Sequence, residues 1–154
     1  MSQFKTIAGG VTAPKGFKAS GIHAGIKGPK LDMALVVSER PAAVAGTFTS
    51  NLIQGATVKL CKQRLATRKG QAVIVNSGCA NACVGPQGLL DARQMARLTA
   101  EGLGIDEKLV YVCSTGVIGR RLPMDKIATG VRLAVPALIP DGGDLAAKAI
   151  MTTD

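Results

Sequence analysis

Two short apolar segments that each end in a turn of small residues constrain the fold of this sequence most strongly. Gln71–Asn76 (QAVIVN) contains four consecutive apolar residues and runs into Ser77-Gly78, and Lys108–Ser114 (KLVYVCS) runs into Thr115-Gly116. Apolar runs of this length, rich in β-branched residues and bounded by turn residues, predict strands. The unbroken apolar run of the first segment further predicts a strand buried on both faces.

Three segments between and after these strands predict helices. Gly88–Gly104 carries apolar residues at helical spacing, charged residues on another face and glycines that can end a helix. Met124–Leu133 is opened by a proline and an acidic residue and should be stopped by Pro136. Asp144–Ile150 predicts a third helix, capped by a residue within 141–144.

The N-terminal half predicts further strands. Leu31–Ser38 (LDMALVVS) indicates a buried strand ended by the segment 39–41 (ERP), and Ala45–Ser50 and Ala56–Leu60 alternate well enough to be the next strands, in a meander or a set of hairpins. Residues 9–30 hold six glycines and two prolines, which is typical of turns that join very short strands. Strands followed by helices predict a mixed α/β fold, and the length predicts a single domain over all 154 residues.

The charge of the chain lies in its first half. The formal net charge is +9, and residues 1–70 hold 11 basic and 2 acidic residues, whereas residues 71–154 hold 8 of each. Single-stranded nucleic acid would also need stacking aromatic side chains, and the chain has three phenylalanines, one tyrosine and no tryptophan. We therefore expect no nucleic-acid partner, and interpret the basic half as a solvated or partner-facing surface or as an attraction for acidic metabolites.

The apolar runs are much shorter than the roughly 20 residues that span a bilayer, so no membrane segment is predicted. Met1–Gly10 lacks the apolar core of a secretory signal, which predicts a cytoplasmic location. The sequence has four cysteines, Cys61, Cys79, Cys83 and Cys113. In this location they are expected to be free thiols, and no metal site is predicted because their spacing lacks a second ligand pair.

Few chemical motifs stand out from the residues alone. The sequence contains neither a P-loop nor a dinucleotide-binding glycine motif, and the single histidine, His23, is interpreted as a surface or packing residue. The two asparagines of the segment 76–83 (NSGCANAC) are interpreted as holding a structural turn. Ser114-Thr115-Gly116 can place two hydrogen-bond donors near an oxyanion at a strand end, although the residues alone favour an ordinary turn.

The order of the motifs along the whole chain resembles the bifunctional ornithine acetyltransferase / N-acetylglutamate synthase family of arginine biosynthesis. The motifs are GGVTAPKGF (9–17), AGIK (24–27), AGTFTSN (45–51), VNSGCANAC (75–83), QGLLDA (87–92), STGVIGRRLPMDKI (114–127) and AIMTTD (149–154). This resemblance implies an αββα sandwich, completed by a β chain that is cut from the same precursor.

The resemblance also implies a reaction. Such enzymes move an acetyl group from N-acetylornithine to glutamate through an acetyl-threonine on the first residue of the β chain. It assigns Thr115 and Gly116 to the oxyanion hole and one of Thr152 and Thr153 to the substrate, in a heterotetramer of two α and two β chains. No cofactor is expected, and the sequence leaves open whether acetyl-CoA serves as a second acetyl donor.

The family's KGxGM segment and its M-A-T cleavage site lie a few dozen residues beyond the TTD motif, with which this chain ends. We therefore expect the chain to be most of an α chain and inactive by itself. Two alternatives stay open, a non-enzymatic small-ligand or partner-binding module on the same scaffold and, with less support, a self-cleaving amidohydrolase.

Overall fold

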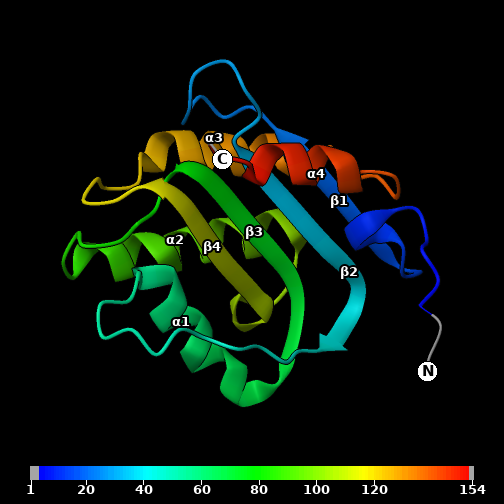
Figure 1. The fold of residues 1–154 in the computed structure, drawn as a ribbon, viewed down its shortest axis with the longest axis horizontal. Helices are drawn as coiled ribbons and strands as arrows, with labels where there is room; N and C mark the ends of the chain where they lie inside the picture. The colour runs from blue at the N-terminus through cyan, green and yellow to red at the C-terminus, as the bar shows by residue number, and fades with distance from the viewer. Residues whose placement is uncertain (1–3, 153–154) are drawn as a thin grey trace.

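The computed structural model describes residues 4–152, and these form a four-stranded sheet flanked by helices (Figure 1). The strands are β1 (Phe17–Ile22), β2 (Met33–Ala43), β3 (Lys69–Cys79) and β4 (Val110–Val117), in the order β1-β2-β3-β4. Neighbouring strands are antiparallel except β3 and β4, which are parallel. The mixed α/β class and the two strongest strand predictions are confirmed, while the second sheet of an αββα sandwich stays a prediction.

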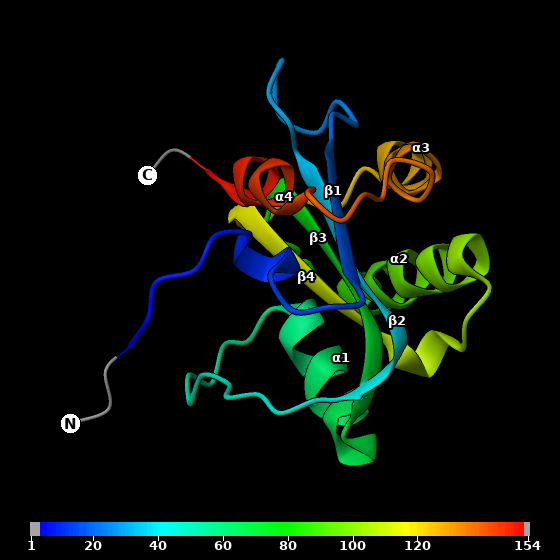
Figure 2. The same ribbon diagram turned by 90° about the vertical axis from the view of Figure 1, so that its right-hand side faces the viewer.

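Four α-helices pack around this sheet: α1 (Ala56–Arg64), α2 (Gln87–Leu103), α3 (Met124–Ala134) and α4 (Gly143–Ile150). The crossover from β3 to β4 runs through α2. Figure 2 shows α2 and α3 on one side of the sheet and α4 on the opposite side. Helix α1 lies against α2 and along β4, the last strand of the sheet. Within the described residues, no helix has the length and apolar character needed to cross a membrane.

The main core lies between the sheet and helices α1 to α3. Its sheet side is formed by alternate strand residues, and Met33, Leu35, Ile74, Val110 and Val112 are almost completely buried there. Burying one such side chain stabilises the fold by about 1.5–3 kcal/mol. A smaller cluster of alanines joins β1 and β2 to α4 on the other face. Because α4 is short, residues of β3 on that face, such as Val73 and Val75, are only half-buried, so the prediction of burial on both faces is wrong.

Two strand predictions before β3 are also wrong. Ala56–Leu60 begins helix α1, because Ala56, Leu60 and Arg64 recur at helical spacing on one buried face; the alternation within ATVKL had favoured a strand. Ala45–Ser50 has no regular structure. The expected meander is therefore limited to β1, β2 and β3, and α1 separates the last two of these strands.

The ends of the elements differ from prediction in two places. Strand β2 starts at Met33 and continues through Pro41 to Ala43. Proline is tolerated there because the β2–β3 pairing is interrupted between Val37 and Ala42, so no hydrogen bond of the sheet requires an N–H at Pro41. Helix α4 begins after Gly142 with no side-chain cap, since a Cβ at this position would lie 1.8 Å from the carbonyl oxygen of Ala19 in β1.

The other helix predictions are confirmed. Helix α2 ends at Leu103 with Gly104 in the left-handed conformation, where its N–H donates to two carbonyls of the last turn. Helix α3 starts directly after Pro123 and ends at Ala134, two residues before Pro136. These helices hold β3 and β4 side by side, and their carboxyl ends form one edge of the sheet.

Candidate functional site

The carboxyl ends of β3 and β4 bring two of the predicted motifs into register. Ser77 pairs with Thr115, and Gly78 pairs with Gly116. Thr115 is half-buried, and its hydroxyl has no hydrogen-bond partner within residues 4–152. A hydroxyl and an adjacent backbone amide at such a strand end are able to donate to one oxygen of a ligand.

Asn76 braces the two strand ends. Its side chain is completely buried; the hydroxyl of Ser114 donates to its Oδ1 at 2.6 Å, and its Nδ2 donates to the carbonyl of Cys79 at 2.9 Å. Asn81 acts similarly one turn later, since its Nδ2 donates to the carbonyl of Gly88 at 2.9 Å. The interpretation of both asparagines as turn-holding residues is confirmed, and Asn76 fixes the end of β4 beside Thr115 through its hydrogen bond with Ser114.

Gly116 allows the two strand ends to approach closely. Its φ is +124°, and a Cβ there would lie 2.4 Å from the carbonyl carbon of Gly78. A side chain would therefore both strain the backbone and overlap with β3. The other side of the Gly116 backbone is exposed and lines the space beside the strand ends.

A cleft of about 650 Å³ lies beside these strand ends. It is lined by Gly78 of β3, by Thr115, Gly116 and Val117 of β4, by the loop Lys27–Lys30, and by Thr152 after α4. The structure thus brings three of the four predicted site residues, Thr115, Gly116 and Thr152, to one cleft from segments far apart in the sequence. Thr153 lies outside the described residues.

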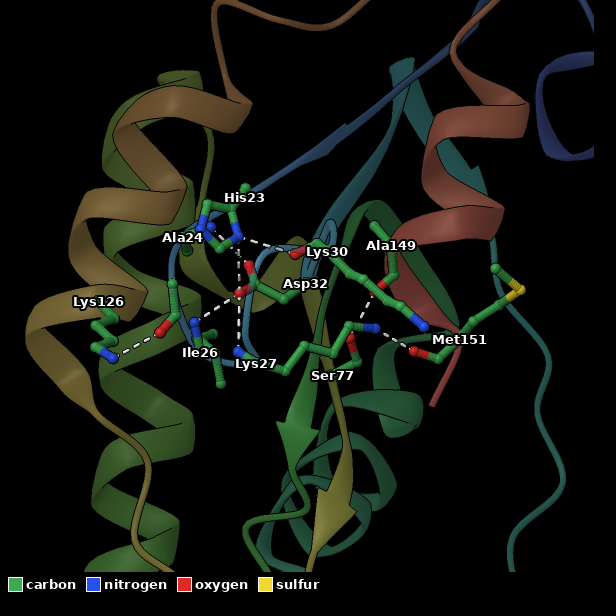
Figure 3. A network of polar contacts seen from close by, with 11 residues as sticks. His23, Ala24, Ile26, Lys27, Lys30, Asp32, Ser77, Lys126, Ala149 and Met151 are labelled. Carbon is green, nitrogen blue, oxygen red and sulfur yellow. Dashed lines mark hydrogen bonds and ion pairs between the residues drawn. The ribbon is translucent and has the colours of Figure 1, made fainter. Parts of the chain in front are cut away.

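Two contacts hold the segment after α4 at the cleft. The hydroxyl of Ser77 donates to the carbonyl of Ala149 at 2.6 Å, and the ammonium of Lys27 donates to the carbonyl of Met151 (Figure 3). They join the end of α4 to β3 and to the loop between β1 and β2. The position of Thr152 therefore depends on Ser77 and Lys27.

Sequence reasoning missed the loop between β1 and β2 as part of the site. Asp32, whose side chain is completely buried, accepts hydrogen bonds from the backbone N–H groups of Ala24 (2.6 Å), Ile26 (2.6 Å) and Lys27 (3.1 Å), as Figure 3 shows. An acidic residue inside the apolar run LDMALVV was the signal that could have revealed this anchor, since a buried carboxylate needs such partners.

His23 lies on the outer side of the same loop. Its Nδ1 is 2.8 Å from the carbonyl oxygen of Lys30 and 3.5 Å from Oδ2 of Asp32. Because a carbonyl only accepts hydrogen bonds, Nδ1 carries the proton and donates it. His23 thus supports the loop, in agreement with its interpretation as a packing residue.

All four cysteines are free thiols, as predicted. Cys61 and Cys79 are buried, and their thiols donate to the carbonyls of Val112 at 3.2 Å and of Arg120 at 3.0 Å. Burial raises the pKa of the Cys61 thiol. Among the described residues, no three His, Cys, Asp or Glu side chains are grouped as metal ligands.

The geometry defines a class of site: a cleft at the carboxyl ends of two parallel strands, with hydroxyl, backbone and ammonium donors around an open glycine backbone. Comparison with known proteins supplies the family. The sequence model of the ArgJ family matches residues 18–154. The arginine biosynthesis bifunctional protein ArgJ of Symbiobacterium thermophilum is 56% identical over 151 residues, which cover 96% of this chain and 38% of that protein.

Two solved structures share the fold. An ornithine acetyltransferase from Mycobacterium tuberculosis, solved with ornithine bound, has a TM-score of 0.92 and 49% identity, covering 96% of this chain and 81% of that chain. The ArgJ protein of Bacillus halodurans has a TM-score of 0.88 and 45% identity, covering 95% of this chain and 77% of that chain. The chain belongs to the ArgJ family. It spans 38% of the length of the first curated relative.

Proposed function

We propose that this chain is part of an acetyltransferase that moves the acetyl group of N-acetylornithine to glutamate in arginine biosynthesis. The cleft carries this proposal, because it gathers the free hydroxyl of Thr115, the exposed backbone of Gly116 and the chain at Thr152 around one space. The similar structure from Mycobacterium tuberculosis holds ornithine, which is one product of this reaction.

In the proposed reaction a threonine of a β chain is the nucleophile. Its hydroxyl oxygen bonds to the acetyl carbon of N-acetylornithine while its own terminal amine takes the hydroxyl proton. The C–N bond then breaks, the proton passes to the leaving nitrogen, and ornithine departs from an acetyl-threonine ester. The amine of glutamate attacks this ester, which forms N-acetylglutamate and restores the threonine.

Thr115 and Gly116 act on the oxygen that becomes negative in both steps. The Thr115 hydroxyl and the Gly116 N–H donate to this oxyanion, and preorganised donors of this kind lower the barrier because they need no rearrangement. Thr152 or Thr153 contacts the substrate. No cofactor takes part, and acetyl-CoA is a second acetyl donor if the protein is bifunctional.

The proposed assembly is a heterotetramer of two such α chains and two β chains. We place it in the cytoplasm, where thiols such as the four of this chain stay reduced. Val36, Val73 and Val75, which are half-buried on the face of the sheet beside α4, offer the β chain an apolar surface.

Co-expression with a β chain of the family tests the proposal. The assembly should produce N-acetylglutamate from N-acetylornithine and glutamate, and the 154-residue chain alone should produce none. Turnover by the chain alone would show that it holds its own nucleophile. Transfer to water instead of glutamate would indicate an amidohydrolase, and binding of N-acetylornithine without turnover by the assembly would indicate a binding module.

A further inference from the structure

Two lysines line the cleft, and the acetyl-transfer steps give neither of them a role. Lys27 and Lys30 lie on the loop between β1 and β2. Figure 3 shows both side chains extending from this loop toward Met151, near Ser77. Two positive charges therefore lie on the same side of the space that Thr115 and Gly116 face.

The Lys27 side chain is held directly against the strand end. A Cβ on Gly78 would lie 2.9 Å from the Cβ of Lys27, so the lysine stem packs on the residue that pairs with Gly116. Its ammonium donates to the carbonyl of Met151. An ammonium has three N–H groups, so this contact leaves donors for a ligand.

Asp32 fixes the loop without neutralising the lysines. Its carboxylate accepts from three backbone N–H groups, including that of Lys27. Within residues 4–152, no carboxylate forms an ion pair with Lys27 or Lys30, and none of the residues lining the cleft is acidic. Burial lowers the pKa of Lys27, with the nearby charge of Lys30 adding to this effect and Asp32 opposing it. A bound anion would offset this unfavourable desolvation.

We propose that Lys27, assisted by Lys30, binds the α-carboxylate of the acetylated amino acid while Thr115 and Gly116 face its acetyl carbonyl. This inference rests on the proposed function and names the part of the substrate that the lysines recognise. In an N-acetyl amino acid only the nitrogen and the α-carbon separate the acetyl carbon from the carboxylate carbon. A site for one group must therefore lie directly beside a site for the other, as the lysines lie beside the strand ends.

Kinetics with and without the carboxylate test this inference in the assembly with the β chain. N-acetylputrescine is N-acetylornithine without its α-carboxylate. Lys27→Met should raise KM for N-acetylornithine on the order of 10- to 100-fold, the effect of one charge-assisted hydrogen bond. It should lower kcat/KM for N-acetylputrescine far less, because that smaller loss reflects only the broken contact with Met151 beside Thr152. Lys30→Met should have a smaller effect in the same direction, because this side chain is exposed.

Lys108→Met is the matched control, since it removes the same charge beside the opposite end of β4 from an exposed residue. It should leave KM for both donors unchanged. Equal losses for both donors in Lys27→Met, or no loss for N-acetylornithine, would overturn the inference.

A binding measurement separates this inference from the acetyl transfer itself. Amide spectra of the assembly are titrated with N-acetylglycine and with its neutral methylamide. The acid should shift the signals of Gly78 and Gly116 much more than the methylamide, and Lys27→Met should weaken its binding at least tenfold. Unchanged binding of the acid to Lys27→Met would overturn the inference, whereas specific binding of the acid without any acetyl transfer would overturn only the proposed function.

Discussion

The two ends of the β3–β4 pair differ in chemistry although the same two strands form both. At the start of the strands, an apolar groove of about 340 Å³ is lined by side chains that include Val44, Phe48, Val73 and Tyr111. At the carboxyl ends, the larger cleft is lined by lysines, threonines and glycines. The first end contributes packing surface, and the second end presents hydrogen-bond donors.

The difference follows from how each end is covered. Helix α1 covers the edge of β4 near its start, where Arg64 donates to the carbonyl of Val110 and forms an ion pair with Glu107 at 2.6 Å. Within residues 4–152, no helix covers the carboxyl ends of the two strands in this way. There the side chain of Asn76 links the strand ends through its hydrogen bonds with Ser114 and Cys79. In open α/β sheets ligands bind at the carboxyl ends of strands, and the proposed acetyl transfer uses this end of the molecule.

The largest expected effect comes from Thr115 at the polar end. In the assembly with a β chain, Thr115→Ala should lower kcat by about 10²–10³, the loss for one oxyanion donor, and leave the thermal melting temperature unchanged. Thr115→Ser keeps the hydroxyl and should recover most of the rate. Tyr111→Phe, at the apolar end of the same strand, removes only the donation to the carbonyl of Lys69 and should leave kcat unchanged. A normal kcat in Thr115→Ala would mean that the turn is purely structural.

Backbone crowding at the polar end predicts a loss of stability. Gly116→Ala should lower the free energy of unfolding by about 1–3 kcal/mol from backbone strain alone, with a further loss from the overlap with Gly78. Gly119→Ala is the matched control, because φ is +78° there but the space around it is open. Denaturant unfolding should show a smaller loss of unfolding free energy for Gly119→Ala. Equal losses for both variants would mean that the overlap with β3 does not contribute to the stability cost of Gly116→Ala.

The half-buried face beside α4 predicts association. Expressed alone, the chain should self-associate, because Val73 and Val75 of β3 are only half-buried on that face. Light scattering after size-exclusion chromatography measures this directly. With a β chain, the same measurement should give the mass of two α and two β chains. A monodisperse monomer with a sharp, cooperative thermal transition would contradict this prediction.

The smallest effect is expected from the thiols. Blocking them should leave acetyl transfer largely unchanged, since the reaction uses none of them. Exposed Cys83 should react first with a disulfide reagent at pH 8. Cys113 should react slowly: the residue is exposed but lines the apolar groove, and desolvation raises the pKa of its thiol to about 11. Loss of activity in step with modification of Cys79 or Cys83, prevented by substrate, would assign a thiol to the site.

The sequence predicted the parts of this molecule that local patterns determine. Strands β3 and β4 and helices α2 and α3 carry strong periodicity and terminal signals such as Gly104 and Pro123. Helix α1 was missed because the short segment 56–60 alternates like a strand, whereas burial of one helical face against α2 and β4 decides the outcome. The extension of β2 through Pro41 depends on an interrupted pairing that only the sheet reveals.

The candidate site was predicted only in part for the same reason. Thr115 and Gly116 are adjacent in sequence and belong to a motif, so they could be named in advance. The role of Asp32 depends on backbone groups up to eight residues away, and Lys27 reaches Met151 from 124 positions away. Such contacts are products of the fold and leave no periodic signal.

A crystal structure of the assembly with N-acetylglutamate would show where the acetyl carbonyl binds. We expect the acetyl oxygen at about 2.7–3.1 Å from the Thr115 hydroxyl and the Gly116 nitrogen. The carboxylate on the α-carbon should lie against the Lys27 ammonium. A ligand that lies in the apolar groove, or one that turns its acetyl group away from Thr115 and Gly116, would show that these residues do not form the oxyanion site.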